Sequence, residues 1–137
     1  MDMKKILLIG IFLASLFAQQ SGKELFEANC MACHATKKPQ NKKDMTAPAI
    51  MGVMYHVKQR YPNKADAVRF IVDYVKNPSP QKALCPSVKR FGLMPKLDLD
   101  DKTLTKIAEY IYDNYPPQGF KHPKGKGMGM KRMGMFN

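Results

Sequence analysis

The sequence predicts an all-α domain, and three helical stretches carry this prediction. Residues 63–77 and 100–115 each begin with a residue type that caps helices, carry apolar side chains at helical spacing and end beside prolines. Residues 22–29, which follow Ser21, also have the pattern of a short helix. With 137 residues, of which 45% are hydrophobic and 25% charged, the chain has the composition of one modest globular domain.

Residues 1–18 have the pattern of a secretory signal peptide. Met1–Lys5 contains two lysines, and Ile6–Ala18 is an apolar run of 13 residues, shorter than the roughly 20 that span a bilayer. A cut after Ala18 predicts a periplasmic mature protein without a stable membrane span. Leu16 is the third residue before this cut, where signal peptides usually have a small side chain. An uncleaved membrane anchor is therefore the alternative.

The predicted helix Gly22–Asn29 leads directly into Cys30-Met31-Ala32-Cys33-His34, the attachment motif for c-type haem. Two thiols at this spacing can each add to one haem vinyl group, and His34 then lies where its imidazole can bind the iron. A thioredoxin-type motif would need a strand–helix context, and a structural zinc site would need four ligands. The motif therefore predicts one covalently bound haem c with His34 as an axial ligand.

A polar loop, Ala35–Asp44, follows this motif and contains four lysines: Lys37, Lys38, Lys42 and Lys43. It is either an ordinary solvated loop or a docking patch that steers an acidic redox partner. The formal charge of +12, or +11 without residues 1–18, favours acidic partners or anionic surfaces. An exported protein is not expected to bind nucleic acid.

The middle of the chain predicts a second helix that Asn63 caps and that ends near Asn77, because Pro78 disfavours helical geometry before it. Its apolar stripe consists of Ala67, Phe70, Ile71 and Tyr74. We expect Tyr74 and Tyr61 to be packed tyrosines, with a hydrogen bond to a haem propionate as the alternative. Ser79–Lys89 predicts a short helix that Pro86 interrupts.

The last predicted helix has Asp100 as its N-cap and ends at Pro116-Pro117. Leu99 and Leu104 stand at the two positions of a hydrophobic staple. The buried stripe is predicted to consist of Leu104, Ile107, Ala108 and Ile111.

Met94 is the strongest candidate for the second axial ligand of the iron. It lies between Gly92 and Pro95, where glycine gives backbone freedom and proline rigidity just ahead of the last helix. The competing candidates are Met51, Met54, His56 and His122. A methionine ligand closes the site and suits electron transfer, a second histidine lowers the potential, and an open position permits ligand binding.

Two further features concern the third cysteine and the C-terminal tail. Cys85 is not used by the haem motif, and we expect a buried inert thiol there, with an intermolecular bridge as the alternative. Residues 116–137 form a basic tail rich in Met, Gly and Lys, which predicts disorder. Thioether sulfur suits Cu(I), so the tail offers a weak copper site; a plain flexible tail is the alternative.

Residues 21–115 resemble the class I c-type cytochromes. The matching positions are Gly22 and Phe26 before the Cys-Met-Ala-Cys-His motif, Ala47-Pro48-Ala49-Ile50-Met51-Gly52, and Gly92-Leu93-Met94-Pro95-Lys96-Leu97. The second of these is similar to the family's Gly-Pro-x-Leu-x-Gly loop, with Ala47 in place of the first glycine. The resemblance implies a cytochrome c fold over residues 19–115, with helices around one covalent haem c and the N- and C-terminal helices crossing. It also implies that the carbonyl of Pro48 accepts the second ring hydrogen of His34.

The expected function is that of a periplasmic monohaem c-type cytochrome, which transfers single electrons between redox partners through iron ligated by His34 and Met94. No set of residues indicates a substrate pocket or an acid–base pair, so an electron-transfer protein is expected rather than an enzyme, either free or as an oxidoreductase subunit. One alternative is a haem-based sensing protein with a labile sixth ligand. The other is a copper-handling protein that uses the Met-rich tail.

Overall fold

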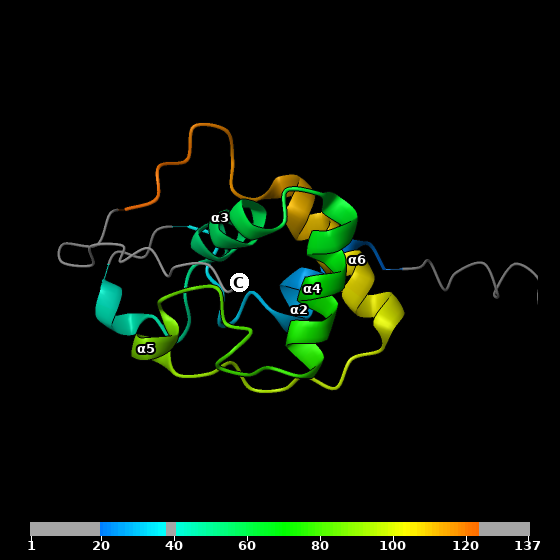
Figure 1. Ribbon diagram of the computed structural model, residues 1–137, viewed down its shortest axis with the longest axis horizontal. Coiled ribbons are helices and arrows are strands. Elements are labelled where there is room, and N and C mark those ends of the chain that lie inside the picture. The colour runs from blue at the N-terminus through cyan, green and yellow to red at the C-terminus, as the bar shows by residue number, and fades with distance from the viewer. Residues whose placement is uncertain (1–19, 38–40, 124–137) are drawn as a thin grey trace, which may run out of the picture.

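The computed structural model describes residues 20–37 and 41–123. In this part of the chain it contains five α-helices, one 3-10 helix and no strand, which confirms the predicted all-α fold. The elements are α2 (Gly22–Asn29), η1 (Lys42–Asp44), α3 (Ile50–Arg60), α4 (Lys64–Lys76), α5 (Val88–Phe91) and α6 (Asp101–Asn114). Figure 1 shows α2, α4 and α6 gathered on one side of the molecule and α3 and α5 on the other.

Helix α2 begins with a complete capping box. The amide of Glu24 donates to Ser21 Oγ at 3.3 Å, and the amide of Ser21 donates to Glu24 Oε2 at 2.7 Å. Each side chain thereby satisfies an amide that has no partner within the helix. The helix ends at Asn29, and the amide of Cys30 donates to the carbonyl of Phe26 at 2.9 Å. The start of the cysteine motif is therefore fixed to the last turn of α2.

Helices α2 and α6 cross at Gly22, as predicted. A Cβ atom at this position would lie 2.8 Å from Tyr110 Cβ and would overlap the carbonyl oxygen of Lys106. Only glycine permits this approach of two backbones. One turn further, the ring of Phe26 is 1% exposed and lies 5.8 Å from the ring of Tyr110 and 6.0 Å from that of Tyr115.

Helices α4 and α6 also begin where the sequence predicts. Asn63 Oδ1 accepts from the amide of Ala65 at 2.9 Å, and Asp100 Oδ1 accepts from the amide of Thr103 at 2.9 Å. Leu104, Ile107, Ala108 and Ile111 of α6 are all buried, as expected from their helical spacing.

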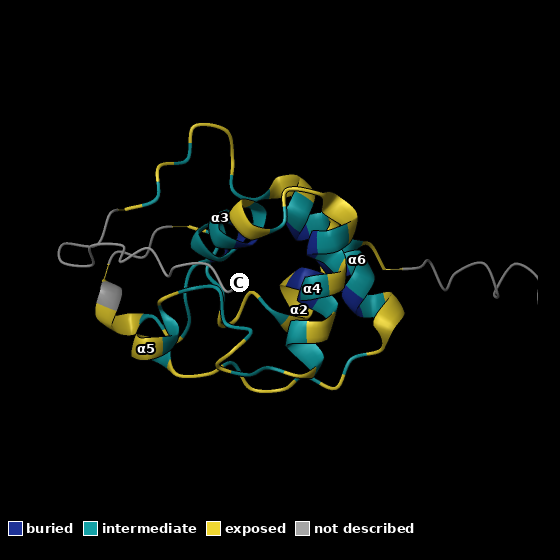
Figure 2. Ribbon diagram, in the orientation of Figure 1, coloured by how far each residue is buried: buried dark blue, intermediate teal, exposed yellow. Residues whose placement is uncertain are grey.

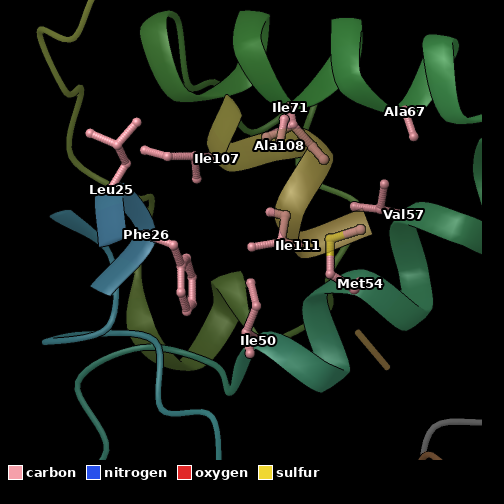
Figure 3. Close-up of a cluster of buried hydrophobic side chains, with 10 residues drawn as sticks. All are labelled: Leu25, Phe26, Ile50, Met54, Val57, Ala67, Ile71, Ile107, Ala108 and Ile111. Atoms are coloured by element: carbon pink, nitrogen blue, oxygen red, sulfur yellow. The ribbon is translucent and has the colours of Figure 1, made fainter. Parts of the chain in front are cut away.

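The core lies where α2, α3, α4 and α6 face one another, and the outer faces of these helices are exposed (Figure 2). Figure 3 shows its buried side chains, which are Leu25, Phe26, Ile50, Met54, Val57, Ala67, Ile71, Ile107, Ala108 and Ile111. All of them are apolar, so their burial is the main stabilising contribution of the fold.

Two helices differ from the expectation. Helix α3 was not predicted, although Ile50, Met54 and Val57 have the spacing of a buried helical stripe. The helix expected within Ser79–Lys89 is wrong, because the segment forms turns and α5 begins only at Val88. Pro86 disfavours helical geometry in Cys85, whereas just before a helix its missing N–H costs nothing.

The beginning of the predicted tail also differs from the expectation. The structure places Phe120 and His122 beside α3, where the ring of Tyr55 stacks on His122 at 4.7 Å and meets Phe120 at 6.2 Å. The expected signal peptide, residues 1–18, and the remainder of the tail, residues 124–137, lie outside the described residues. Within the described residues, no helix has the length and apolar character needed to cross a bilayer.

Candidate functional site

The cysteine motif forms a tight turn directly after α2. The amides of Cys33 and His34 both donate to the carbonyl of Cys30, at 3.2 and 2.9 Å. This turn brings both thiols and the imidazole to the same end of α2. Cys30 is half-buried and Cys33 exposed, and burial together with the neighbouring Cys33 raises the pKa of the Cys30 thiol to about 11.

His34 is held from the segment that leads into α3. Its Nδ1 lies 2.8 Å from the carbonyl oxygen of Pro48, and the amide of Ile50 donates to the carbonyl of Ala35 at 3.1 Å. A carbonyl oxygen only accepts, so Nδ1 carries the proton and Nε2 keeps its lone pair. Burial lowers the pKa of His34, an effect that the hydrogen bond to Pro48 opposes. The neutral imidazole with a free Nε2 is the form that binds metal.

Met94 lies in a short segment that is anchored at both ends. Gly92 closes α5 with a φ of 78°, a conformation in which other residues are strained, and its amide donates to the carbonyl of Val88 at 2.9 Å. Beyond Met94, the amide of Leu97 donates to the carbonyl of Val75 in α4 at 3.2 Å. These bonds hold the half-buried Met94 beside the interior of the fold.

A cavity of about 250 Å³ brings these residues together. Cys30, Cys33, His34, Pro48 and Met94 all line it. The rest of its wall is mainly apolar and comes from α2, α3, α4, α6 and the segment 83–97; it includes Phe26, Ile50, Val53, Val57, Phe70, Ile71, Val75, Leu84, Val88, Phe91, Leu93, Leu97, Leu104, Ile107 and Ile111. Residues more than 60 positions apart in the sequence thus surround one apolar space.

The competing ligand candidates fall into two groups. Met54 also lines the cavity, but it is completely buried and packs among the core side chains (Figure 3). Met51, His56 and His122 are not among the residues that line the cavity. Of the competing candidates named from the sequence, Met54 is therefore the one that the structure brings to the cavity, and its helical spacing with Ile50 and Val57 accounts for its burial.

Cys85 and two tyrosines complete the surroundings of the cavity. Cys85 lines it and is half-buried, and its sulfur accepts a hydrogen bond from Ser87 Oγ at 2.7 Å. Tyr74 also lines the cavity, whereas Tyr61 does not and stacks instead on Phe70 at 4.9 Å. Tyr74 stacks on Phe70 as well, at 5.8 Å, so both tyrosines are packed as expected, and Tyr74 is the one that also lines the cavity.

The donor set around this cavity fits a covalently attached haem. Two thiols suit covalent attachment and an imidazole with a free Nε2 suits ligation of the iron, while the thioether of Met94 is a further donor at the cavity and the apolar wall suits the macrocycle. In the part of the chain that the structure describes, no cluster of three or more His, Cys, Asp or Glu side chains offers a competing metal site. The fold and these residues define a c-type cytochrome of class I.

Comparison with known proteins identifies the family. The family model described as cytochrome c oxidase, cbb3-type, subunit III matches residues 17–111, and the chain belongs to this family. The domain therefore carries a covalently bound haem c, which contains iron. An uncharacterized protein of Aquifex aeolicus (strain VF5) is 29% identical in an alignment of length 135. The alignment covers 82% of this chain and 89% of the relative. No solved structure matches the chain significantly.

Proposed function

We propose that this chain is a periplasmic monohaem cytochrome that passes single electrons between redox proteins, with His34 and Met94 as the axial ligands of its iron. The observation that carries the proposal is the single apolar cavity in which Cys30, Cys33, His34 and Met94 meet. The bound haem supplies reversible one-electron oxidation and reduction of its iron. Cys30 and Cys33 would hold the group as thioethers.

The chain prepares His34 for its role as a ligand. The carbonyl of Pro48 fixes the ring orientation and the proton on Nδ1, so Nε2 is available without rearrangement. A hydrogen bond to the second ring nitrogen also raises the basicity of the ligating one. The bond between Ile50 and Ala35 keeps the Pro48 segment in register with the motif.

Met94 would close the other face of the iron. A thioether ligand would favour the reduced state and raise the potential. The backbone hydrogen bonds of Gly92 and Leu97 fix the chain on both sides of Met94. The mainly apolar wall would place the haem in surroundings of low dielectric constant, one of the properties by which a protein tunes the potential.

An acidic face on the partner protein is the proposed docking surface. No acidic residue occurs in residues 45–65 or 74–97, which include α3, α5 and the Met94 segment, whereas both stretches contain lysine and arginine. The acidic residues of α4 and α6 are partly neutralised by lysines, as in the pair Lys64–Asp113 at 2.7 Å. Lys37 and Lys43 of the predicted docking loop are exposed, and Lys38 lies outside the described residues.

Two large apolar side chains next to cavity-lining residues are exposed. Met31, in the cysteine motif, is 42% exposed, and Leu93, next to Met94, is 39% exposed. Together with the surrounding positive charge, they would give a partner a small apolar contact with a basic rim. Export through residues 1–18 and weak Cu(I) binding by the tail belong to the same proposal; both concern residues largely outside the described part of the chain.

Absorption spectra of two matched variants test the ligand assignment. In the oxidised protein, Met94→Leu should remove the long-wavelength sulfur–iron band, and Met54→Leu should keep it. Both changes conserve volume and should cost less than about 1.5 kcal/mol, so the haem domain should stay folded in each. The reduction potential should fall in Met94→Leu because the thioether ligand is lost.

The opposite pattern, with the band lost only in Met54→Leu, would assign the ligand to α3 and overturn the role of Met94. Rapid carbon monoxide binding by the reduced wild-type protein at neutral pH would contradict a stable sixth ligand. That result would favour the sensing function over electron transfer.

A further inference from the structure

Two histidines in contact join the segment 117–123 to α3, outside the haem cavity. The ring centroids of His56 and His122 are 4.7 Å apart, with 70° between the ring planes. The ring of Tyr55 stacks on His122 at 4.7 Å and contacts His56 edge-on at 5.4 Å. Neither histidine is among the residues that line the cavity, so the proposed electron transfer does not use them.

Side-chain packing holds the segment 117–123 on α3 (Figure 1). The backbone hydrogen bond from the amide of Phe120 to the carbonyl of Pro117, at 3.1 Å, lies within the segment and closes a turn. In the described part of the chain, no hydrogen bond or ion pair joins the segment to α3. Docking therefore depends on the contacts of Phe120 and His122 with the ring of Tyr55 and on the contact between the two histidines.

The contact between the two imidazoles suits their neutral forms. His56 Nε2 is inaccessible to solvent and has no hydrogen-bond partner in the structure. Protonation would place an N–H group and a positive charge at this ring without an acceptor for Nε2, which burial disfavours. A proton on His122 would add a second charge in direct ring contact with the first. Burial and the neighbouring His122 lower the pKa of His56 accordingly.

The charged groups on the neighbouring elements do not compensate a protonated pair. Residues 45–65 and the chain after Asp113 contain no Asp or Glu, and Asp113 itself, on α6, pairs with Lys64 at 2.7 Å. On α3, Lys58 extends to α6, where its Nζ lies 4.6 Å from the centre of the Tyr112 ring. Lys121, next to the second histidine, is an exposed cation in the segment itself. In the described residues, no carboxylate forms a three-membered cluster with the two imidazoles.

We propose that His56 and His122 form a proton-sensitive latch, which holds the segment 117–123 on α3 at neutral pH and releases it when the histidines take up protons. A histidine whose pKa is lower in the docked state takes up a proton on release, so docking weakens as the pH falls below the ordinary histidine value of 6.5. The equilibrium constant for release then rises by up to about 10-fold per pH unit for each histidine. Because the basic sequence from Lys124 to Arg132 follows directly, the latch determines where that stretch leaves the domain.

Amide hydrogen exchange of the haem-loaded full chain, followed by mass spectrometry of peptides that cover residues 117–123, tests this latch. The wild type is compared with His122→Phe, which keeps an aromatic ring against Tyr55 but takes up no proton. At about pH 7.5 the two should exchange alike, and at about pH 5.5, on the other side of the ordinary histidine pKa, the wild type should exchange up to about 10-fold faster. Since both proteins are measured at the same pH, the pH dependence of chemical exchange cancels.

Two further variants separate the imidazole from charge in general and from loss of the fold. His122→Lys carries a charge at both pH values, so its segment should exchange faster than that of the wild type already at about pH 7.5. Lys121→Gln is the matched control, because it removes a neighbouring exposed charge and should keep the pH dependence of the wild type. Neither position lines the haem cavity, so the haem spectrum should be unchanged in all variants.

Two results would overturn the proposal. If the wild type and His122→Phe exchange alike at both pH values, protonation of His122 does not release the segment. If His122→Lys is as protected as the wild type at about pH 7.5, a charge at this position is compatible with docking. Failure of the latch would leave the haem assignment untouched, since the ligand test with Met94→Leu does not involve the segment 117–123.

Discussion

Replacing Gly22 with alanine places a methyl group between α2 and α6 at the point where they cross. The added Cβ would lie 2.8 Å from Tyr110 Cβ and would overlap the Lys106 carbonyl oxygen. Neither of these atoms can rotate away, because one belongs to the backbone and the other is fixed to it. The two helices would have to separate.

Two opposing effects set the magnitude. Alanine is favoured over glycine in a helix by up to about 1 kcal/mol. Overpacking of a tight contact costs typically about 1–3 kcal/mol, and the rigidity of both neighbours points to the upper part of that range. We therefore expect a net loss of about 1–2 kcal/mol in the free energy of unfolding. For a domain of this size, each kcal/mol lowers the melting temperature by roughly 4–8 °C.

Gly52→Ala in α3 is the matched control. A Cβ there would meet only His122 Nε2, at the ordinary contact distance of 3.8 Å, so the helix propensity of alanine should make this variant as stable as the wild type or more stable. Thermal and urea unfolding of the haem-loaded proteins, followed by far-ultraviolet circular dichroism, compares the three. Equal stability of Gly22→Ala and the wild type would refute the steric account of the crossing.

Two further predictions concern the cap of α2 and the core. Glu24→Gln should be less stable than the wild type at neutral pH, because hydrogen bonds from Ser21 lower the pKa of the Glu24 carboxyl, and a group with a lowered pKa stabilises the folded state only while it is ionised. The difference should close as the pH falls through that lowered pKa; urea unfolding at several pH values measures it, and a constant difference would exclude the charge as its cause. Ile107→Ala should reduce the free energy of unfolding by about 2–5 kcal/mol, because the side chain is 3% exposed and its loss leaves a cavity. A loss below about 1 kcal/mol in urea unfolding would mean that the core collapses around the site.

Helix boundaries were predictable where capping residues and prolines mark them. Ser21, Asn63 and Asp100 each accept hydrogen bonds from the first turn of a helix, and such bonds depend only on neighbours in the sequence. Helix α3 was missed because Ala49, at its N-cap, makes no side-chain hydrogen bond, so no local signal marks its start. Its existence is instead supported by the burial of Ile50, Met54 and Val57.

The position of α5 shows the limit of local signals. Two prolines bracket Gln81–Cys85, and the sequence alone does not show on which side of Pro86 a helical turn forms. The turn forms after it, where Gly92 can close the helix at a φ of 78° and direct the next residues toward the cavity.

The sequence by itself indicated the attachment motif, because Cys30, Cys33 and His34 are near neighbours whose spacing along the chain does not depend on the fold. The resemblance to the class I c-type cytochromes implied which helices cross, and the structure places the crossing at Gly22. Tertiary structure decided what surrounds the haem site, because His34, Pro48 and Met94 meet only after α3 and the segment before α6 have packed. It alone placed Met54 at the cavity and brought His56 beside His122. The physical reason is that contacts between distant residues depend on how helices pack, and packing is a property of the whole set of buried side chains.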